Sequence, residues 1–183
     1  MRKFIPRLSV QLLTTLAILM ALSFVLAKFR IQVTPGLRVS FEFLPNVLIG
    51  FFGGPFFAAL LLGLADIINY SLNPMGGYLV LYGLAQMASG FLYGLFFYRR
   101  AIDTRKWQDW LYVTVATIVI AAFTNFGLIP LALEPLLKQN YWQQMFVGGR
   151  IFKIVEIPFH VVIFMFLLPQ VQKLPEVKRL LRK

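Results

Sequence analysis

Long apolar runs separated by short polar segments dominate the pattern of this chain. A helix that crosses the hydrocarbon core of a bilayer needs about 20 mostly apolar residues. Runs of this kind predict membrane helices over Leu8–Phe29, Gly77–Tyr98, Trp110–Leu131 and Gly148–Leu168. These helices, rather than any soluble element, are the first structural expectation from the sequence.

A further apolar region, Phe41–Tyr70, is too long for one span. Gly53-Gly54-Pro55 interrupts it, and we expect a break there because glycine is flexible and proline cannot continue a helix. We therefore predict a short helix over Phe41–Phe52 and a longer one over Pro55–Tyr70. The total is six helices, of which the second is too short to span a bilayer alone.

Composition supports a membrane protein. Of the 183 residues, 59% are hydrophobic and 14% are charged, whereas soluble domains are about 45–50% apolar and 25% charged. A soluble domain of this size leaves roughly a third of its unfolded-chain surface in water, which this composition does not suit. Disorder is excluded because it requires low hydrophobicity. We predict a single all-α integral membrane domain over residues 1–183, a six-helix bundle in a multi-pass arrangement.

The basic residues predict the orientation of the bundle. Net charge is +11, and 12 of the 18 Lys and Arg residues precede the first helix, lie between the fourth and fifth, or follow the sixth. With six helices, all three segments fall on one side of the membrane. The positive-inside rule then places both termini in the cytoplasm. This accounts for the charge without nucleic acid, which we do not expect as a partner.

The residues needed for catalysis are scarce. The chain has no cysteine and one histidine, His160. No phosphate-binding loop, nucleophile elbow or metal motif is present in the sequence. We therefore expect neither an enzyme nor a bound metal or cofactor.

The last helix carries a charged stripe inside an apolar segment. Arg150, Lys153, Glu156 and His160 are separated by three, three and four residues, which places them on one face of a helix. Charges at membrane depth usually face a cavity or a partner. One interpretation is a polar pocket in which Arg150 and Lys153 bind an anionic ligand. The alternative is a stripe neutralised by its own Lys153–Glu156 and Glu156–His160 pairs, with Arg150 reaching outward to water.

Two other polar groups are candidates for the same pocket. Asp66 and Asn69 lie three residues apart near the outer end of the third helix, where they either bind a ligand or tie the loop to the next helix. Glu42 and Asn46 lie on the short second helix, and broken helices often line ligand sites in transporters. The alternative for Glu42 is an interfacial pair with Arg38.

Small residues are spaced for close helix packing. Ala17 and Ala21 on the first helix, and Gly90 and Gly94 on the fourth, each follow a small-x-x-x-small pattern. Each pattern alone is a weak signal, and the alanines could equally pack inside the bundle.

Together these motifs resemble the substrate-binding S components of energy-coupling factor (ECF) vitamin transporters, most closely the folate family. The resemblance extends over almost the whole chain. It is carried by Ala17-x-x-x-Ala21, Phe43-Leu44-Pro45, Gly50, Gly54-Pro55, Ala65-Asp66-Ile67-Ile68, Gly90-x-x-x-Gly94 followed by Arg99-Arg100, and Arg150-x-x-Lys153 with Pro158.

The resemblance implies a mechanism and partners. S components are six-helix bundles of the bacterial cell membrane that capture a vitamin in an outward-facing pocket. They dock on a transmembrane scaffold subunit driven by two ATPase subunits and are thought to topple in the membrane to carry the vitamin inward. Ala17 and Ala21 match the docking surface.

The substrate implied is folate, with pantothenate as the alternative. Folate-specific members usually carry an aromatic-Pro-Gly-Phe-Thr segment where this chain has Gly77-Tyr78-Leu79-Val80-Leu81, so only an aromatic residue, Tyr78, is kept. We expect Arg150 and Lys153 to hold a substrate carboxylate, with Arg38 as a further cation. Asp66, Asn69, Glu42 and Asn46 would bind the polar end and Tyr78 would stack on it. A structural or assembly membrane protein is the alternative from another functional class.

Overall fold

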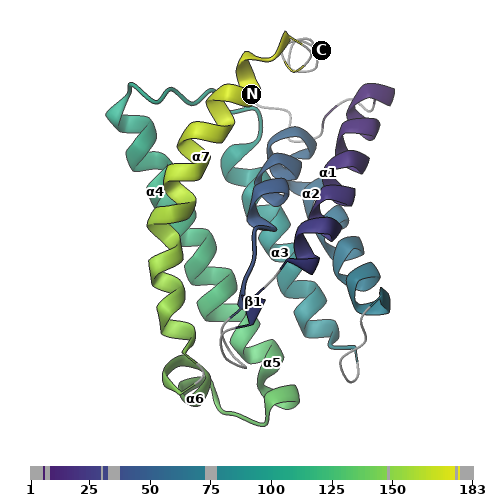
Figure 1. Ribbon diagram of the computed structural model, residues 1–183, viewed down its shortest axis with the longest axis vertical. Helices are drawn as coiled ribbons and strands as arrows, with labels where there is room; N and C mark the ends of the chain where they lie inside the picture. The colour runs from purple at the N-terminus through teal and green to yellow at the C-terminus, as the bar shows by residue number, and fades with distance from the viewer. Residues whose placement is uncertain are drawn as a thin grey trace.

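The fold is a helical bundle, seen in a computed structural model that describes residues 6, 9–29, 31–32, 38–72, 78–147, 149–175 and 177 (Figure 1). Its helices are α1 (Val10–Lys28), α2 (Phe43–Leu72), α3 (Val80–Phe97), α4 (Trp107–Ala121), α5 (Ile129–Leu137), α6 (Tyr141–Phe146) and α7 (Glu156–Lys173). A π-helix, η1 (Ala122–Leu128), joins α4 to α5, and a 3₁₀-helix, η2 (Arg150–Val155), precedes α7. Strands β1 (Ile31–Gln32) and β2 (Arg38–Val39) form a small antiparallel pair.

The apolar runs fold as predicted, with some different limits. Five stretches of the described residues are long and apolar enough to cross a membrane: Val10–Lys28, Phe43–Leu72, Val80–Phe97, Trp107–Pro135 and Arg150–Lys173. The predicted Trp110–Leu131 helix begins earlier, at Trp107, and helical structure continues to Leu137. The all-α membrane class is thus supported, while six separate passes stay a prediction.

α2 is broken at the predicted position. Gly54 has φ 72° and ψ −179°, a conformation that L side chains rarely adopt, and Pro55 follows it. In Figure 1 the arm before Gly54 and the arm after it run in opposite directions. The prediction that residues 41–70 form two helices rather than one is confirmed.

α3 packs closely against both arms of α2 because glycines remove side chains from the contact. A Cβ atom on Gly94 would lie 2.4 Å from the backbone of Gly54 and Pro55, and one on Gly90 would lie 2.4 Å from the carbonyl oxygen of Ala58. Gly50 on the first arm meets the backbone of Tyr93 and Gly94 in the same way. The Gly90-x-x-x-Gly94 spacing therefore marks a true helix contact.

Aromatic side chains fill the core between α2, α3 and α7. Phe164 on α7 is fully buried, and its ring makes edge-on contacts with Phe43, Tyr93 and Phe97 at centroid distances of 5.9, 6.2 and 5.6 Å. Such edge-to-face pairs are a favoured geometry of aromatic rings.

The first turn of α1 and the last turn of α7 lie at the same end of the bundle, and α6 lies at the opposite end (Figure 1). The connection from α3 to α4 shares the first end, because the Gln172 side chain on α7 donates to the carbonyl of Arg100 and accepts from the N–H of Ile102. The first turn of α1, the last turn of α7 and the basic α3–α4 connection therefore share one end of the bundle.

Candidate substrate-binding cavity

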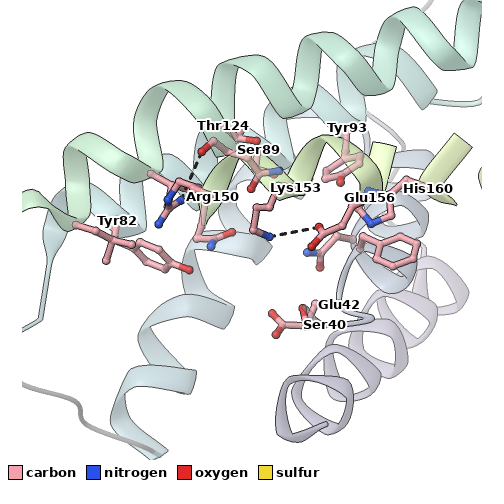
Figure 2. A pocket seen from close by; sticks show the side chains of 16 residues that line it. Ser40, Glu42, Tyr82, Ser89, Tyr93, Thr124, Arg150, Lys153, Glu156 and His160 are labelled. Atoms are coloured by element: carbon pink, nitrogen blue, oxygen red, sulfur yellow. Dashed lines mark hydrogen bonds and ion pairs between the residues drawn. The ribbon is translucent and has the colours of Figure 1, made fainter. Parts of the chain in front are cut away.

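A cavity of about 170 Å³ lies between α2, α3, the η1–α5 segment and the η2–α7 segment (Figure 2). Its lining combines two cations, two carboxylates, amides, hydroxyls and aromatic rings: Ser40, Glu42, Phe43, Asn46, Tyr82, Gln86, Ser89, Tyr93, Thr124, Asn125, Ile129, Leu133, Arg150, Lys153, Glu156 and His160. The charged stripe of the last span therefore faces a polar cavity rather than lipid.

The η2 segment explains how the charged residues line up. In a 3₁₀-helix, side chains three residues apart eclipse one another. Arg150, Lys153 and Glu156 consequently form one column along the cavity wall, and Gly149, with φ 72°, sets the turn at which this segment begins. An α-helix would stagger the same three residues across one face instead of aligning them.

The two interpretations of the stripe can now be compared. Lys153 Nζ lies 3.3 Å from Glu156 Oε2, so this pair forms as the self-neutralised interpretation predicted. His160 instead packs its ring on Phe43, at a centroid distance of 3.9 Å. Arg150 is only 3% exposed and donates through Nη1 to the carbonyl of Asn125 at 3.5 Å. The prediction that Arg150 reaches outward to water is therefore wrong.

The start of α2 supplies the facing wall. Glu42 and Asn46 both line the cavity, as their spacing predicted. Asn46 Oδ1 also accepts a hydrogen bond from Ser23 Oγ of α1 at 3.4 Å, which fixes the orientation of the amide. Arg38 lies on β2, and its side chain falls outside what the structure describes.

Two sets of lining residues were not predicted as site residues. Gln86 and Ser89 lie on one face of α3 with Tyr82 and Tyr93, at offsets of four, seven and eleven residues from Tyr82. Thr124 and Asn125 come from the π-helix η1. The periodic polar face of α3 was readable from the sequence, whereas the π-helix has no comparable signal.

Asp66, Asn69 and Tyr78 do not line this cavity. The Tyr78 hydroxyl donates to Asp66 Oδ2 at 3.2 Å, and the rings of Tyr70 and Tyr78 meet edge-on at 5.1 Å. Gly83 leaves room for this cluster, since a Cβ there would lie 2.3 Å from the Tyr78 hydroxyl. Burial and then the Asp66 carboxylate raise the pKa of Tyr78.

Ala17 and Ala21 lie on the exposed face of α1. Their small side chains leave a shallow strip on a helix whose buried side is formed by Leu12, Leu16, Leu19, Ser23 and Ala27. They do not pack inside the bundle, so the packing alternative for these alanines is wrong.

The comparisons with known proteins agree with this geometry. Residues 11–168 match the family described as the ECF transporter, substrate-specific component. The chain belongs to this family. The resemblance inferred from the motifs is confirmed, and the chain is a transport component of the membrane rather than an enzyme or a purely structural protein.

Individual relatives cover nearly the whole S component. The folate transporter FolT of Streptococcus mutans serotype c is 38% identical over 176 residues, which are 96% of this chain and 94% of that protein. FolT of Leuconostoc mesenteroides is 29% identical over 167 residues, 89% of this chain and 87% of that protein. A crystal structure of FolT bound with folic acid superposes with a TM-score of 0.75 at 27% identity, covering 88% of this chain and 94% of that one.

Proposed function

We propose that this S component binds folate and delivers it to an ECF importer. The observation that carries the proposal is the cavity, in which Arg150 and Lys153 lie on one wall and Glu42 and Asn46 on another. Folate has two carboxylates at one end and a flat ring with hydrogen-bonding edges at the other. Cations suit the carboxylates, and a carboxylate or amide suits the ring edge. Relatives named as folate transporters, and a folic acid-bound neighbour, support the same substrate.

Five residues of the cavity then have proposed roles. Arg150 and Lys153 bind a substrate carboxylate, and Glu42 and Asn46 bind the polar edge of the ring. Tyr82, on the lining face of α3, is the aromatic side chain proposed to stack on it.

The residues outside the lining have a different proposed role. Asp66, Asn69 and Tyr78 hold the end of α2 against the segment before α3, which is the second of the two roles that the sequence left open for Asp66 and Asn69. The Tyr78–Asp66 hydrogen bond supports this assignment.

Pantothenate, the alternative substrate, has no support from the relatives reported above, which are named for folate. Its single carboxylate would need one cation, whereas the cavity presents two. Folate is therefore the substrate that we propose.

The proposed setting is the bacterial cell membrane, with six passes and both termini in the cytoplasm. We propose that the cavity opens outward in this orientation, because its lining includes Ser40 beside β2 and Arg150 of η2, the segment next to α6. Ala17 and Ala21 are proposed to seat the transmembrane scaffold subunit, which two ATPase subunits drive. The exposed position of both alanines on α1 supports this role.

Isothermal titration of the purified protein tests the substrate. We expect saturable heat with folate at about one ligand per chain and none with pantothenate at the same concentration. Since both ligands carry a carboxylate, pantothenate controls for unspecific binding of anions to this basic protein. An absence of heat with folate, or binding of pantothenate alone, would contradict the proposal.

A further inference from the structure

The span that contains η1 leaves two main-chain carbonyls without their usual donors. In an α-helix the N–H of Ile129 would donate to the Asn125 carbonyl, four residues back. Here it donates to the Thr124 carbonyl, five residues back. The next residue is Pro130, which has no N–H. It can therefore donate neither to the Asn125 carbonyl, five residues back, nor to the Phe126 carbonyl, four residues back. The carbonyls of Asn125 and Phe126 must find other partners, because unsatisfied main-chain groups are costly in a membrane.

Side chains from the α6–η2 segment fill this gap. The Tyr141 hydroxyl donates to the Phe126 carbonyl at 2.9 Å, and Arg150 Nη1 donates to the Asn125 carbonyl at 3.5 Å. Gln144, which is fully buried, donates to the Pro130 carbonyl at 3.0 Å. The segment that carries the cavity cation is therefore bonded at two points to the opened turn and at a third to Pro130 of α5.

We infer that the Asn125 carbonyl, exposed by the π-helix and by Pro130, positions the Arg150 guanidinium for the substrate anion. The inference rests on the proposed function. A guanidinium has five N–H donors in a fixed plane, so one can bond the carbonyl while others reach a carboxylate. The carbonyl oxygen also places partial negative charge beside a buried cation. Asn125 thus acts through its main chain, as a positioning residue for Arg150.

Substitution of Pro130 by alanine tests this arrangement. Pro130→Ala restores an N–H that, in the register of the π-helix, reaches the Asn125 carbonyl and competes with Arg150. We expect folate binding at least about threefold weaker. Pro135→Ala is the matched control, since Pro135 lies in the same helix α5, is exposed and does not line the cavity. It should leave the affinity unchanged.

A double-mutant cycle separates positioning from a general structural effect. Arg150→Ala should weaken folate binding about tenfold or more, and Pro130→Ala should have no further effect in that background. Arg150→Gln serves as a second variant if the alanine form does not fold. The inference would be overturned if Pro130→Ala changed folate affinity equally in the presence and absence of Arg150. It would also be overturned if Pro130→Ala had no effect on affinity in either background.

Thermal unfolding of the empty protein gives a readout that does not need the ligand. Arg150→Ala removes the donor to the Asn125 carbonyl, so we expect it to lower Tm. The drop in Tm should be smaller when Pro130→Ala is present as well, because that substitution supplies an N–H to the carbonyl. Additive changes in Tm would refute the contact. If the unaltered protein does not bind folate, the proposed function fails, yet this cycle still tests the positioning of Arg150.

Discussion

Glu156 is the residue that competes most directly with an anionic ligand. Its Oε2 atom pairs with Lys153 Nζ at 3.3 Å, and its Oε1 atom is buried with no hydrogen-bond partner in the described part of the chain. The two side chains are 15% and 20% exposed, so the pair is shielded from bulk water but not fully buried. Glu156 therefore pairs with a cation that a substrate carboxylate would use.

Removal of this charge should tighten folate binding. For Glu156→Gln we expect an affinity about fivefold higher, because repulsion between two carboxylates in a partly wet cavity costs on the order of 1 kcal/mol. Titration calorimetry measures the change. Glu134→Gln is the control, since Glu134 lies on α5 outside the cavity lining. Weaker binding by Glu156→Gln would show that Glu156 contacts the ligand or orients Lys153.

At the scale of elements, the contact between α2 and α3 depends on glycine. A methyl group on Gly94 would lie 2.4 Å from the backbone at Gly54 and Pro55, and a backbone cannot move aside as a flexible side chain can. We expect Gly94→Ala to destabilise the protein by at least about 2 kcal/mol, with a Tm lower by about 5 °C or more. Thermal unfolding in detergent gives the value.

Gly127→Ala provides the matched comparison. A Cβ there would lie 3.4 Å from the Ala122 carbonyl oxygen, which is an ordinary contact. Its Tm should remain close to that of the unaltered protein. Equal losses from the two substitutions would contradict a specific role for the close approach at Gly94.

The helices also show how much of the fold could be predicted from the sequence. Gly53-Gly54-Pro55 predicted the break in α2 because both residue types act locally on the backbone. The 3₁₀-helix η2 was not predicted, and neither was the π-helix η1, whose freed carbonyls are satisfied by side chains from a distant segment. The local sequence pattern does not indicate hydrogen-bond partners from a distant segment.

The same limit applies to the site. Charged residues within apolar spans led to Arg150, Lys153 and Glu42, because a charge at membrane depth usually faces a cavity or a partner. Asn46 was found through its position beside Glu42 on the same short helix, and all four residues line the cavity. Uncharged residues such as Gln86 and Asn125 are cheaper to bury and so gave a weaker signal. Polarity also suggested Asp66, and the family resemblance suggested Tyr78 as a stacking ring. Neither signal distinguishes a ligand site from a hydrogen bond that fixes a helix end.

At the scale of the whole molecule, the exposed strip of α1 gives a prediction about assembly. Tryptophan at both Ala17 and Ala21 would fill the strip and keep a partner helix at a distance. The double variant should no longer co-purify with a scaffold subunit, while folate binding measured by titration should persist. Substitution of Ile18 and Leu22, an exposed pair on the adjacent row of α1, by tryptophan is the control. Retention of the scaffold by the alanine double variant would refute the docking surface.

The orientation of the bundle can be tested by labelling single cysteines, because the chain has none of its own. Thr104 lies in the connection between α3 and α4, beside the basic residues Arg105 and Lys106, and Lys138 lies at the α6 end; both are exposed. The positive-inside rule places Thr104 in the cytoplasm and Lys138 outside. A maleimide that cannot cross membranes should label Lys138→Cys in intact cells, and Thr104→Cys only after lysis. The reverse pattern would invert the bundle and turn the cavity toward the cytoplasm, whereas labelling of both positions in intact cells would exclude a membrane barrier between them.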